Sequence, residues 1–279
     1  MSEIPLLTVE GLNVTFPGRG GDTRAVRDAS FTLGRERLGI VGESGSGKST
    51  TGRALLGLIP HPGVVTARRL MFAGEDLMAL NDAGWQRLRG RRMSMVMQDP
   101  KYSLNPVIRV GRQIQETYRL HFRTTPSDAR RRALAMLDAV KIREADLVYD
   151  FYPHQLSGGM GQRVMIAMML IAEPDLLIAD EPTSALDVTV QNEVLRILDA
   201  LVTDRGMGLI FISHNLTVVS SFCDRVLVMY GGRIVEDCQA SELAAAKHPY
   251  TQALIKAAPS LDQPQAELAS VTRDPAWLT

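Results

Sequence analysis

A nine-residue segment, GESGSGKST at residues 42–50, restricts the possible folds of this chain more than any other part of its sequence. It matches the pattern G-x-x-x-x-G-K-[ST] through Gly42, Gly47, Lys48 and Ser49. The segment directly follows a short apolar run, LGIV, and opens a stretch of helical periodicity, which is the context that gives this pattern meaning. It therefore predicts a strand, a phosphate-binding loop and a helix. The alternative is a simple glycine-rich turn.

The residue types in this loop suit a phosphate group. Glycines let the backbone curl so that successive N–H groups point inward at phosphate oxygens, and the start of the helix adds the positive end of its dipole. Lys48 would place a positive charge on the β- and γ-phosphates of a nucleotide, and the hydroxyl of Ser49 would bind Mg²⁺. The predicted nucleotide-contacting residues of the loop are Gly42, Ser44, Gly45, Gly47, Lys48, Ser49 and Thr50.

Apolar runs bounded by polar residues predict an α/β core. Such runs are typical of the central strands of a parallel sheet that is covered on both faces. They occupy residues 38–41, 93–97, 176–179 and 209–212. Apolar side chains recur at helical spacing over residues 50–58, 127–140, 161–172 and 188–201. Strands that alternate with helices in this way favour an α/β fold.

The remaining segments predict additions to this core. Residues 6–16 have mixed β character, and residues 226–235 predict a hairpin around Tyr230-Gly231-Gly232. The stretch from about 100 to 165 has a helical pattern and little strand signal, so we interpret it as a helical insertion. From about residue 260 the chain is polar with scattered prolines, and we expect little packing there.

Composition limits the classes of protein to which the chain can belong. Its 279 residues suffice for one large domain or two small ones, and a formal net charge of zero implies no bulk attraction to nucleic acid or acidic lipid. The longest apolar run, residues 164–172, is shorter than the roughly 20 residues of a bilayer-spanning helix. The N-terminus lacks the pattern of a signal peptide, and there are only two cysteines. We therefore expect a protein of the reducing cytoplasm.

Two acidic residues end one of the predicted strands. Asp180 and Glu181 directly follow the apolar run LLIA, and ligands of open α/β sheets bind at the carboxyl ends of the strands. Asp180 at the strand tip can hold Mg²⁺, and Glu181 can accept a proton from an attacking water. The alternative is that Glu181 caps the following helix, where acidic residues are favoured.

A histidine follows another predicted strand. His214 is one of five histidines in the chain and comes two residues after the apolar run at 209–212. A lone histidine in such a place is more often a satisfied core residue than a functional one. However, the carboxyl ends of parallel strands lie at one edge of a sheet, so His214 is also a candidate to share the edge of Asp180 and Glu181.

The order of these motifs resembles that of a known family. The glycine loop is followed by LSGGM at residues 156–160, the strand with Asp180 and Glu181, SALD at residues 184–187, and His214. Over roughly residues 6–258 the chain resembles the ATP-binding subunits of ABC transporters. The segments VGESGSGKST, MQDPKYSLNPV, YPHQLSGGM, DEPTSALDVTVQ and HPYTQALIKAAP are similar to those of the oligopeptide, dipeptide and nickel importer branch.

The resemblance implies a dimer in which each ATP lies between the glycine loop of one subunit and the LSGG segment of the other. On this basis Ser157, Gly158 and Gly159 would face the γ-phosphate of ATP held by the opposite subunit. The SALD loop would contact that subunit. Phe16 would stack on adenine, although it is equally well explained as a core residue at the end of a strand.

The same resemblance implies the catalytic roles. Gln98 would sense Mg²⁺ and the attacking water, so the implied metal-contacting residues are Ser49, Gln98 and Asp180. Glu181 would polarise the water, and His214 would contact the γ-phosphate and help to orient it. Two features depart from the family pattern: Gly161 stands where an arginine is usual, and Cys238 is the single C-terminal cysteine, so we expect no iron–sulfur centre.

We therefore expect an α/β fold with a P-loop NTPase core, an N-terminal antiparallel β region and an inserted helical subdomain. Residues 1–258 would form the ATPase domain, with the helical subdomain at about 100–165, followed by a tail at 259–279. The expected cofactors are ATP and Mg²⁺. The resemblance implies a peripheral protein at the cytoplasmic face of the inner membrane that powers import of peptides or a related small solute.

The implied partners are permease transmembrane subunits, a second ATPase subunit in a hetero- or homodimer and, indirectly, a periplasmic or extracellular solute-binding protein. No nucleic acid is expected. Two alternatives remain open at this point. One is a soluble ABC ATPase of a metabolic complex, such as one that cleaves phosphonates. The other is a nucleotide-gated binding module with little turnover, against which Asp180, Glu181 and His214 argue.

Overall fold

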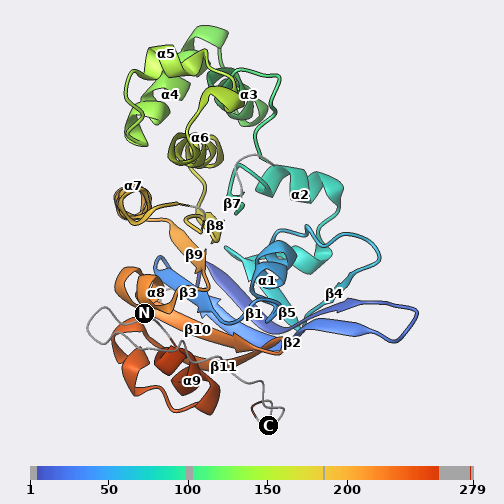
Figure 1. The fold of residues 1–279 in the computed structure, drawn as a ribbon. Helices are drawn as coiled ribbons and strands as arrows, with labels where there is room; N and C mark the ends of the chain where they lie inside the picture. The colour runs from blue at the N-terminus through green and yellow to red at the C-terminus, as the bar shows by residue number, and fades with distance from the viewer. Residues whose placement is uncertain (1–4, 99–102, 185, 258–276, 278–279) are drawn as a thin grey trace. The chain divides into compact units, whose positions relative to one another are not determined.

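The computed structural model describes residues 5–98, 103–184, 186–257 and 277. The chain divides into two compact units, one formed by Met1–Asp82 with Gly208–Thr279 and the other by Ala83–Met207. Figure 1 labels most of their helices and strands. The first unit is thus built from two segments that lie far apart in the sequence.

An antiparallel sheet forms the N-terminal part of the first unit. Its central strand β1 (Leu7–Phe16) pairs with β2 (Thr23–Leu33), and on its other side with β4 (Val64–Thr66) and β5 (Arg69–Phe72). A short strand, β6 (Glu75–Asp76), continues the sheet beyond β5, and the 3₁₀ turn η1 (Leu77–Ala79) follows. The predicted antiparallel β region is confirmed, although the sequence patterns identified only β1 in advance.

Parallel strands form the second layer of this unit. Strand β3 (Arg37–Val41) lies between β9 (Gly208–Ile212) and β10 (Arg225–Tyr230) and is parallel to both. Strand β11 (Arg233–Gln239) returns antiparallel to β10, which confirms the predicted hairpin. Every residue of β9 is buried, as a continuous apolar run requires.

Besides η1, the described residues of the first unit form four further helical segments. They are α1 (Lys48–Leu55), α8 (Leu216–Phe222), the 3₁₀ segment η4 (Ala240–Ala245) and α9 (Pro249–Ala257). Helix α8 packs on β3 so closely that a Cβ atom at Gly39 would lie 2.3 Å from Val219 Cγ1. Burial in the same region raises the pKa of the Cys223 thiol to about 12, so this cysteine behaves as a small apolar residue.

The second unit contains two parallel strands and a group of helices. Strands β7 (Met93–Val96) and β8 (Leu176–Asp180) pair in register. The helices are α2 (Asp82–Leu88), α3 (Val110–His121), α4 (Pro126–Ala139), α5 (Ala145–Tyr149), η3 (Pro153–Gln155), α6 (Gly158–Leu170) and α7 (Val188–Arg205). The stretch predicted to be helical therefore holds α3, α4, α5 and the start of α6. The predicted α/β fold is confirmed.

Two sequence expectations concern the membrane and the tail. Among the residues that the structure describes, no helix is both long and apolar enough to cross a bilayer. Of the expected tail, only Trp277 lies within the described residues. Its ring packs against the rings of Tyr230 and Tyr250, with 5.5 Å between centroids in each case. Little packing was expected there, so this residue is an exception.

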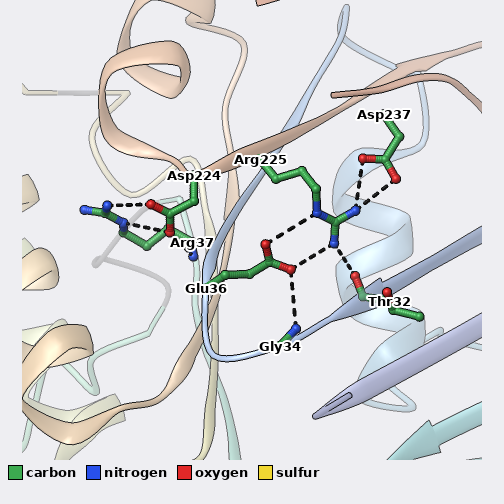
Figure 2. Close-up of polar contacts among 7 residues, drawn as sticks. All are labelled: Thr32, Gly34, Glu36, Arg37, Asp224, Arg225 and Asp237. Atoms are coloured by element: carbon green, nitrogen blue, oxygen red, sulfur yellow. Dashed lines mark hydrogen bonds and ion pairs between the residues drawn. The ribbon is translucent and has the colours of Figure 1, made fainter. Parts of the chain in front are cut away.

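Ion pairs join the strand ends of the first unit (Figure 2). Arg225, at the start of β10, donates to Glu36 at 2.9 Å, to Asp237 of β11 at 2.9 Å and to the carbonyl of Thr32 in β2. Its side chain is only 15% exposed, so these contacts are partly shielded from water. One guanidinium therefore ties β2, β10 and β11 together.

A second ion pair joins Arg37, at the start of β3, to Asp224, which directly precedes β10. The backbone N–H of Arg37 donates to Asp224 at 2.8 Å, and the guanidinium of Arg37 donates to the same carboxylate at 2.7 Å. The hydrogen bond from the guanidinium is the main reason that the pKa of Asp224 lies below its ordinary value. The pair therefore contributes stability above the ordinary carboxyl pKa, and this contribution is lost as pH falls through the lowered pKa.

We predict that Asp224→Asn lowers the free energy of unfolding at pH 7 by about 0.5–1 kcal/mol, because the Asp224 side chain is 42% exposed and water screens the pair. The difference from wild type should shrink as pH falls below about 4, where the wild-type carboxylate also becomes protonated. Urea unfolding at a series of pH values measures this. Asp22→Asn, at an exposed aspartate of the same unit, is the control and should leave the free energy of unfolding at pH 7 unchanged. An equal loss at all pH values would contradict the prediction.

Candidate nucleotide-binding site

The predicted phosphate-binding loop connects β3 to α1 in a backbone conformation that only glycine adopts easily. Gly42 has φ 150° and Gly47 has φ 104°. A Cβ atom at Gly42 would lie 2.2 Å from the carbonyl oxygen of Met229, and one at Gly47 would lie 2.5 Å from that of Ala25. Both distances are too short for any side chain. The two ends of the loop therefore lie directly against the backbones of β10 and β2, so the segment is not a simple surface turn.

The lysine of the loop is buried and held by carbonyl groups. Lys48 is 5% exposed, and its Nζ donates to the carbonyl oxygens of Gly42 and Glu43, both at 2.7 Å. Ser44 and Gly45 are exposed at the loop tip, while Ser49 and Thr50 are half-buried in the first turn of α1. A lysine ammonium, serine hydroxyls and the N–H groups at a helix start form a donor set that suits the phosphates of a nucleotide.

His214 lies at the same sheet edge as this loop. Strand β9 pairs in parallel with β3, with Ile212 opposite Ile40, and the N–H of Ser213 donates to the Ile40 carbonyl at 3.1 Å. Both strands therefore end at the same level, with Gly42 after one and His214 soon after the other. His214 is exposed, so the structure excludes the alternative of a buried core histidine.

In the second unit, the polar residues after β7 and β8 meet. The two strands pair in parallel with Val96 opposite Ala179, so Gln98 and Glu181 follow at the same edge. The side-chain amide of Gln98 donates to Oε2 of Glu181 at 3.1 Å. Asp180, the last residue of β8, is 5% exposed. Gln98, Asp180 and Glu181 therefore lie together at the carboxyl ends of these two paired strands.

The backbone of Glu181 is unusual. Its φ of 49° lies in the left-handed region, which non-glycine residues adopt rarely and which is common at functional sites. The next helix, α7, is capped by Asp187 instead, whose side chain accepts from the N–H of Val190 at 3.0 Å. The alternative in which Glu181 caps this helix is therefore excluded.

The LSGG segment opens helix α6. Ser157 is the N-cap, and its Oγ accepts from the N–H of Met160 at 3.3 Å. Gly158 is exposed in the first turn, with no atom near the position of a Cβ. Gly159 instead packs against α7, because a Cβ atom there would lie 2.6 Å from Val190 Cγ1. The two glycines thus serve different needs: one leaves open space and the other allows close packing.

An arginine that the sequence patterns did not single out supports this segment. Arg163 donates to the carbonyl of Gly159 at 3.2 Å, to that of Lys141 at 2.9 Å and to Glu193 of α7 at 3.1 Å. Its spacing of one helical turn from Gly159 was the available signal. Arg163 therefore joins the start of α6 to α7, close to the unusual Gly161.

The structure also places Phe16, which was predicted either to stack on adenine or to lie in the core. Phe16 is the last residue of β1 and is half-buried, with its ring beside Gly63, where a Cβ atom would lie 2.7 Å from Phe16 Cε1. Among the described residues, no three His, Cys, Asp or Glu side chains gather as a metal site. A Mg²⁺ ion that is bound by substrate phosphates and one or two protein groups needs no such cluster.

Comparison with known proteins decides the family. The family model described as ABC transporter matches residues 26–184, which is more than half of the chain. The chain belongs to the ABC transporter family. It is 46% identical over 272 residues to the oligopeptide transport ATP-binding protein OppD of Salmonella typhimurium, covering 97% of this chain and 81% of the relative. It is 44% identical over 268 residues to the dipeptide transport ATP-binding protein DppD of Escherichia coli, covering 95% and 82%.

One further sequence relative and two solved structures support this family and this fold. A putative peptide import ATP-binding protein of Brucella melitensis is 45% identical over 269 residues, covering 96% of this chain and 81% of that protein. Among solved structures, cbiO1 of Clostridium perfringens has a TM-score of 0.73 at 28% identity, covering 87% and 92%. An ATP-binding cassette dimer bound to ADP and Pi has a TM-score of 0.75 at 24% identity, covering 84% and 98%, and supports the fold. The predicted likeness to oligopeptide and dipeptide importers is confirmed.

We predict that Gly47→Ala weakens ATP binding by about tenfold or more, because overpacking typically costs about 1–3 kcal/mol. The added methyl group would meet the Ala25 carbonyl, so the loop could not keep its conformation. Equilibrium titration with a fluorescent ATP analogue measures the change. Gly74→Ala is a matched control, since Gly74 has a similar φ of 84° but open space around it. Unchanged affinity in Gly47→Ala would contradict this account of the loop.

Proposed function

We propose that the chain is the ATP-binding and ATP-hydrolysing subunit of an ABC importer that powers uptake of peptides or a related small solute. The observation that carries this proposal is the hydrogen bond between Gln98 and Glu181 beside Asp180, in a chain that also has a phosphate-binding loop built on glycines. The names of the relatives supply the direction of transport and the class of solute.

The phosphate-binding loop holds the phosphates of ATP in this proposal. The contacts come from Gly42, Ser44, Gly45, Gly47, Lys48, Ser49 and Thr50. Phe16 stacks on the adenine ring. A second ATPase subunit supplies the LSGG segment that completes each site, so Ser157, Gly158 and Gly159 of this chain serve ATP on the partner. Gly158 is exposed and has open space where a Cβ would lie, which fits an approach by a phosphate to the start of this helix.

Hydrolysis depends on positioned polar groups. Glu181 accepts a proton from the attacking water, and the amide of Gln98 holds its carboxylate in place. His214 orients the water and contacts the γ-phosphate. Ser49, Gln98 and Asp180 would hold Mg²⁺, which when bound supplies positive charge to the phosphates. Most of the rate enhancement then comes from positioning and charge stabilisation.

The proposal extends to organisation and location. Residues 1–258 form the ATPase domain, with the helical subdomain at about 100–165, and residues 259–279 form a tail. The partners are permease transmembrane subunits, a second ATPase subunit and, through the permease, a solute-binding protein outside the membrane. The subunit works as a peripheral protein on the cytoplasmic face of the inner membrane.

We predict that Glu181→Gln retains ATP binding but slows hydrolysis by about 10²-fold or more, the usual scale for a general base. Steady-state phosphate release and ATP titration measure the two properties separately. Glu173→Gln is a matched control: Glu173 also has a left-handed φ, of 53°, and precedes β8 rather than following it. Its turnover should be normal. Near-normal turnover in Glu181→Gln would remove the general-base role.

The transport role is tested by affinity purification from membranes in a gentle detergent. We expect two permease subunits and a second ATPase subunit to co-purify, because each ATP site needs a partner's LSGG segment. Mass spectrometry identifies the proteins, and the accompanying solute-binding protein narrows the solute. Co-purification with soluble enzymes and no permease would instead support the metabolic ATPase and overturn the importer proposal.

A further inference from the structure

The HPYT segment at residues 248–251 lies outside the ATP-binding motifs, yet it contacts the phosphate-binding loop. Tyr250, at the start of α9, is fully buried. Its phenolic oxygen accepts a hydrogen bond from the backbone N–H of Glu43 at 2.9 Å. The two residues are 207 positions apart in the sequence, so the bond joins the C-terminal part of the first unit to the loop.

Glu43 is held on both sides of its backbone. Its N–H donates to Tyr250, and its carbonyl oxygen accepts from Lys48 Nζ at 2.7 Å. The same ammonium also donates to the carbonyl of Gly42. The phenol of Tyr250 therefore fixes the backbone that receives the lysine side chain, and with it the first turn of the loop.

The ring of Tyr250 is itself held in place. It packs against Tyr230 at the end of β10, with 4.4 Å between centroids, and against Trp277 at 5.5 Å. Its backbone N–H donates to Nδ1 of His248 at 3.2 Å, and the N–H of His248 donates to Glu236 of β11 at 2.8 Å. Because the ring and the backbone are both fixed, contacts within the first unit define the position of the hydroxyl.

We propose that Tyr250 is a positioning residue of the ATP site: its buried phenol holds the Glu43 peptide so that the phosphate-binding loop is formed before the nucleotide arrives. A loop that is already ordered loses less conformational entropy on binding, which raises affinity. Removing the hydroxyl would leave a partly buried N–H without this acceptor and allow the loop to rearrange. The inference rests on the proposed role of the loop in holding ATP.

Tyr250→Phe tests this, because it removes the hydroxyl and keeps the ring that packs on Tyr230 and Trp277. We expect the Kd for ATP and for ADP to rise about threefold to tenfold, the effect of losing one hydrogen bond to a partly buried group. KM for ATP should rise with it, while kcat should change little, since Tyr250 is not placed at Glu181 or His214. Amide hydrogen exchange at Glu43 should become faster.

Thr251→Val is the matched control. Thr251 is the next residue of α9, is also fully buried, and its hydroxyl has no hydrogen-bond partner among the described residues. The Thr251→Val variant should have the wild-type affinity for ATP and the wild-type rate of amide hydrogen exchange at Glu43. Wild-type affinity in Tyr250→Phe, or an equal loss in both variants, would overturn the inference while leaving the proposed function intact. A lower melting temperature with unchanged Kd would also overturn it. Failure of the wild-type protein to bind ATP would overturn both proposals.

Discussion

The phosphate-binding loop depends on two backbone carbonyl groups that approach it more closely than any side chain would allow. The oxygens of Met229 and Ala25 occupy the space where Gly42 and Gly47 would carry a Cβ. These carbonyls belong to β10 and β2, which both lie outside the strand–loop–helix segment. In the folded first unit the loop is therefore packed against one strand of the parallel group and one strand of the antiparallel sheet, which leaves no room for a side chain at positions 42 and 47.

Local sequence patterns predicted the strands that are buried on both faces, because such burial leaves a recognisable apolar run in the sequence. Apart from the half-buried Arg37 at the start of β3, the strands β3, β7, β8 and β9 are buried along their length, so apolar residues dominate their sequences. Their carboxyl ends place polar residues at a sheet edge, which is how Asp180, Glu181 and His214 became candidates, whereas Gln98 was implied by the family resemblance. In the second unit the side chain of Gln98 is bonded to that of Glu181.

Local patterns were less informative for half-exposed or very short strands and for contacts between residues that are far apart in the sequence. Strand β2 alternates buried and exposed residues among charged ones, and β4 to β6 have two to four residues each, which is too short for a clear period. The bond from Glu43 to Tyr250 joins residues that no window of sequence contains together. The capping of α7 by Asp187, rather than by Glu181, likewise depends on where the helix begins.

The packing of α6 on α7 has a consequence for how this chain can evolve. The side chain of Val190 fills the space in which a Cβ atom at position 159 would lie. Arg163 of α6 also donates a hydrogen bond to Glu193 of α7. A larger residue at position 159 is therefore tolerable only with a smaller one at position 190. The two positions should vary as a pair among related sequences. The start of α6, which carries the LSGG segment, and the start of α7, which follows the SALD segment, should therefore change together during evolution rather than independently.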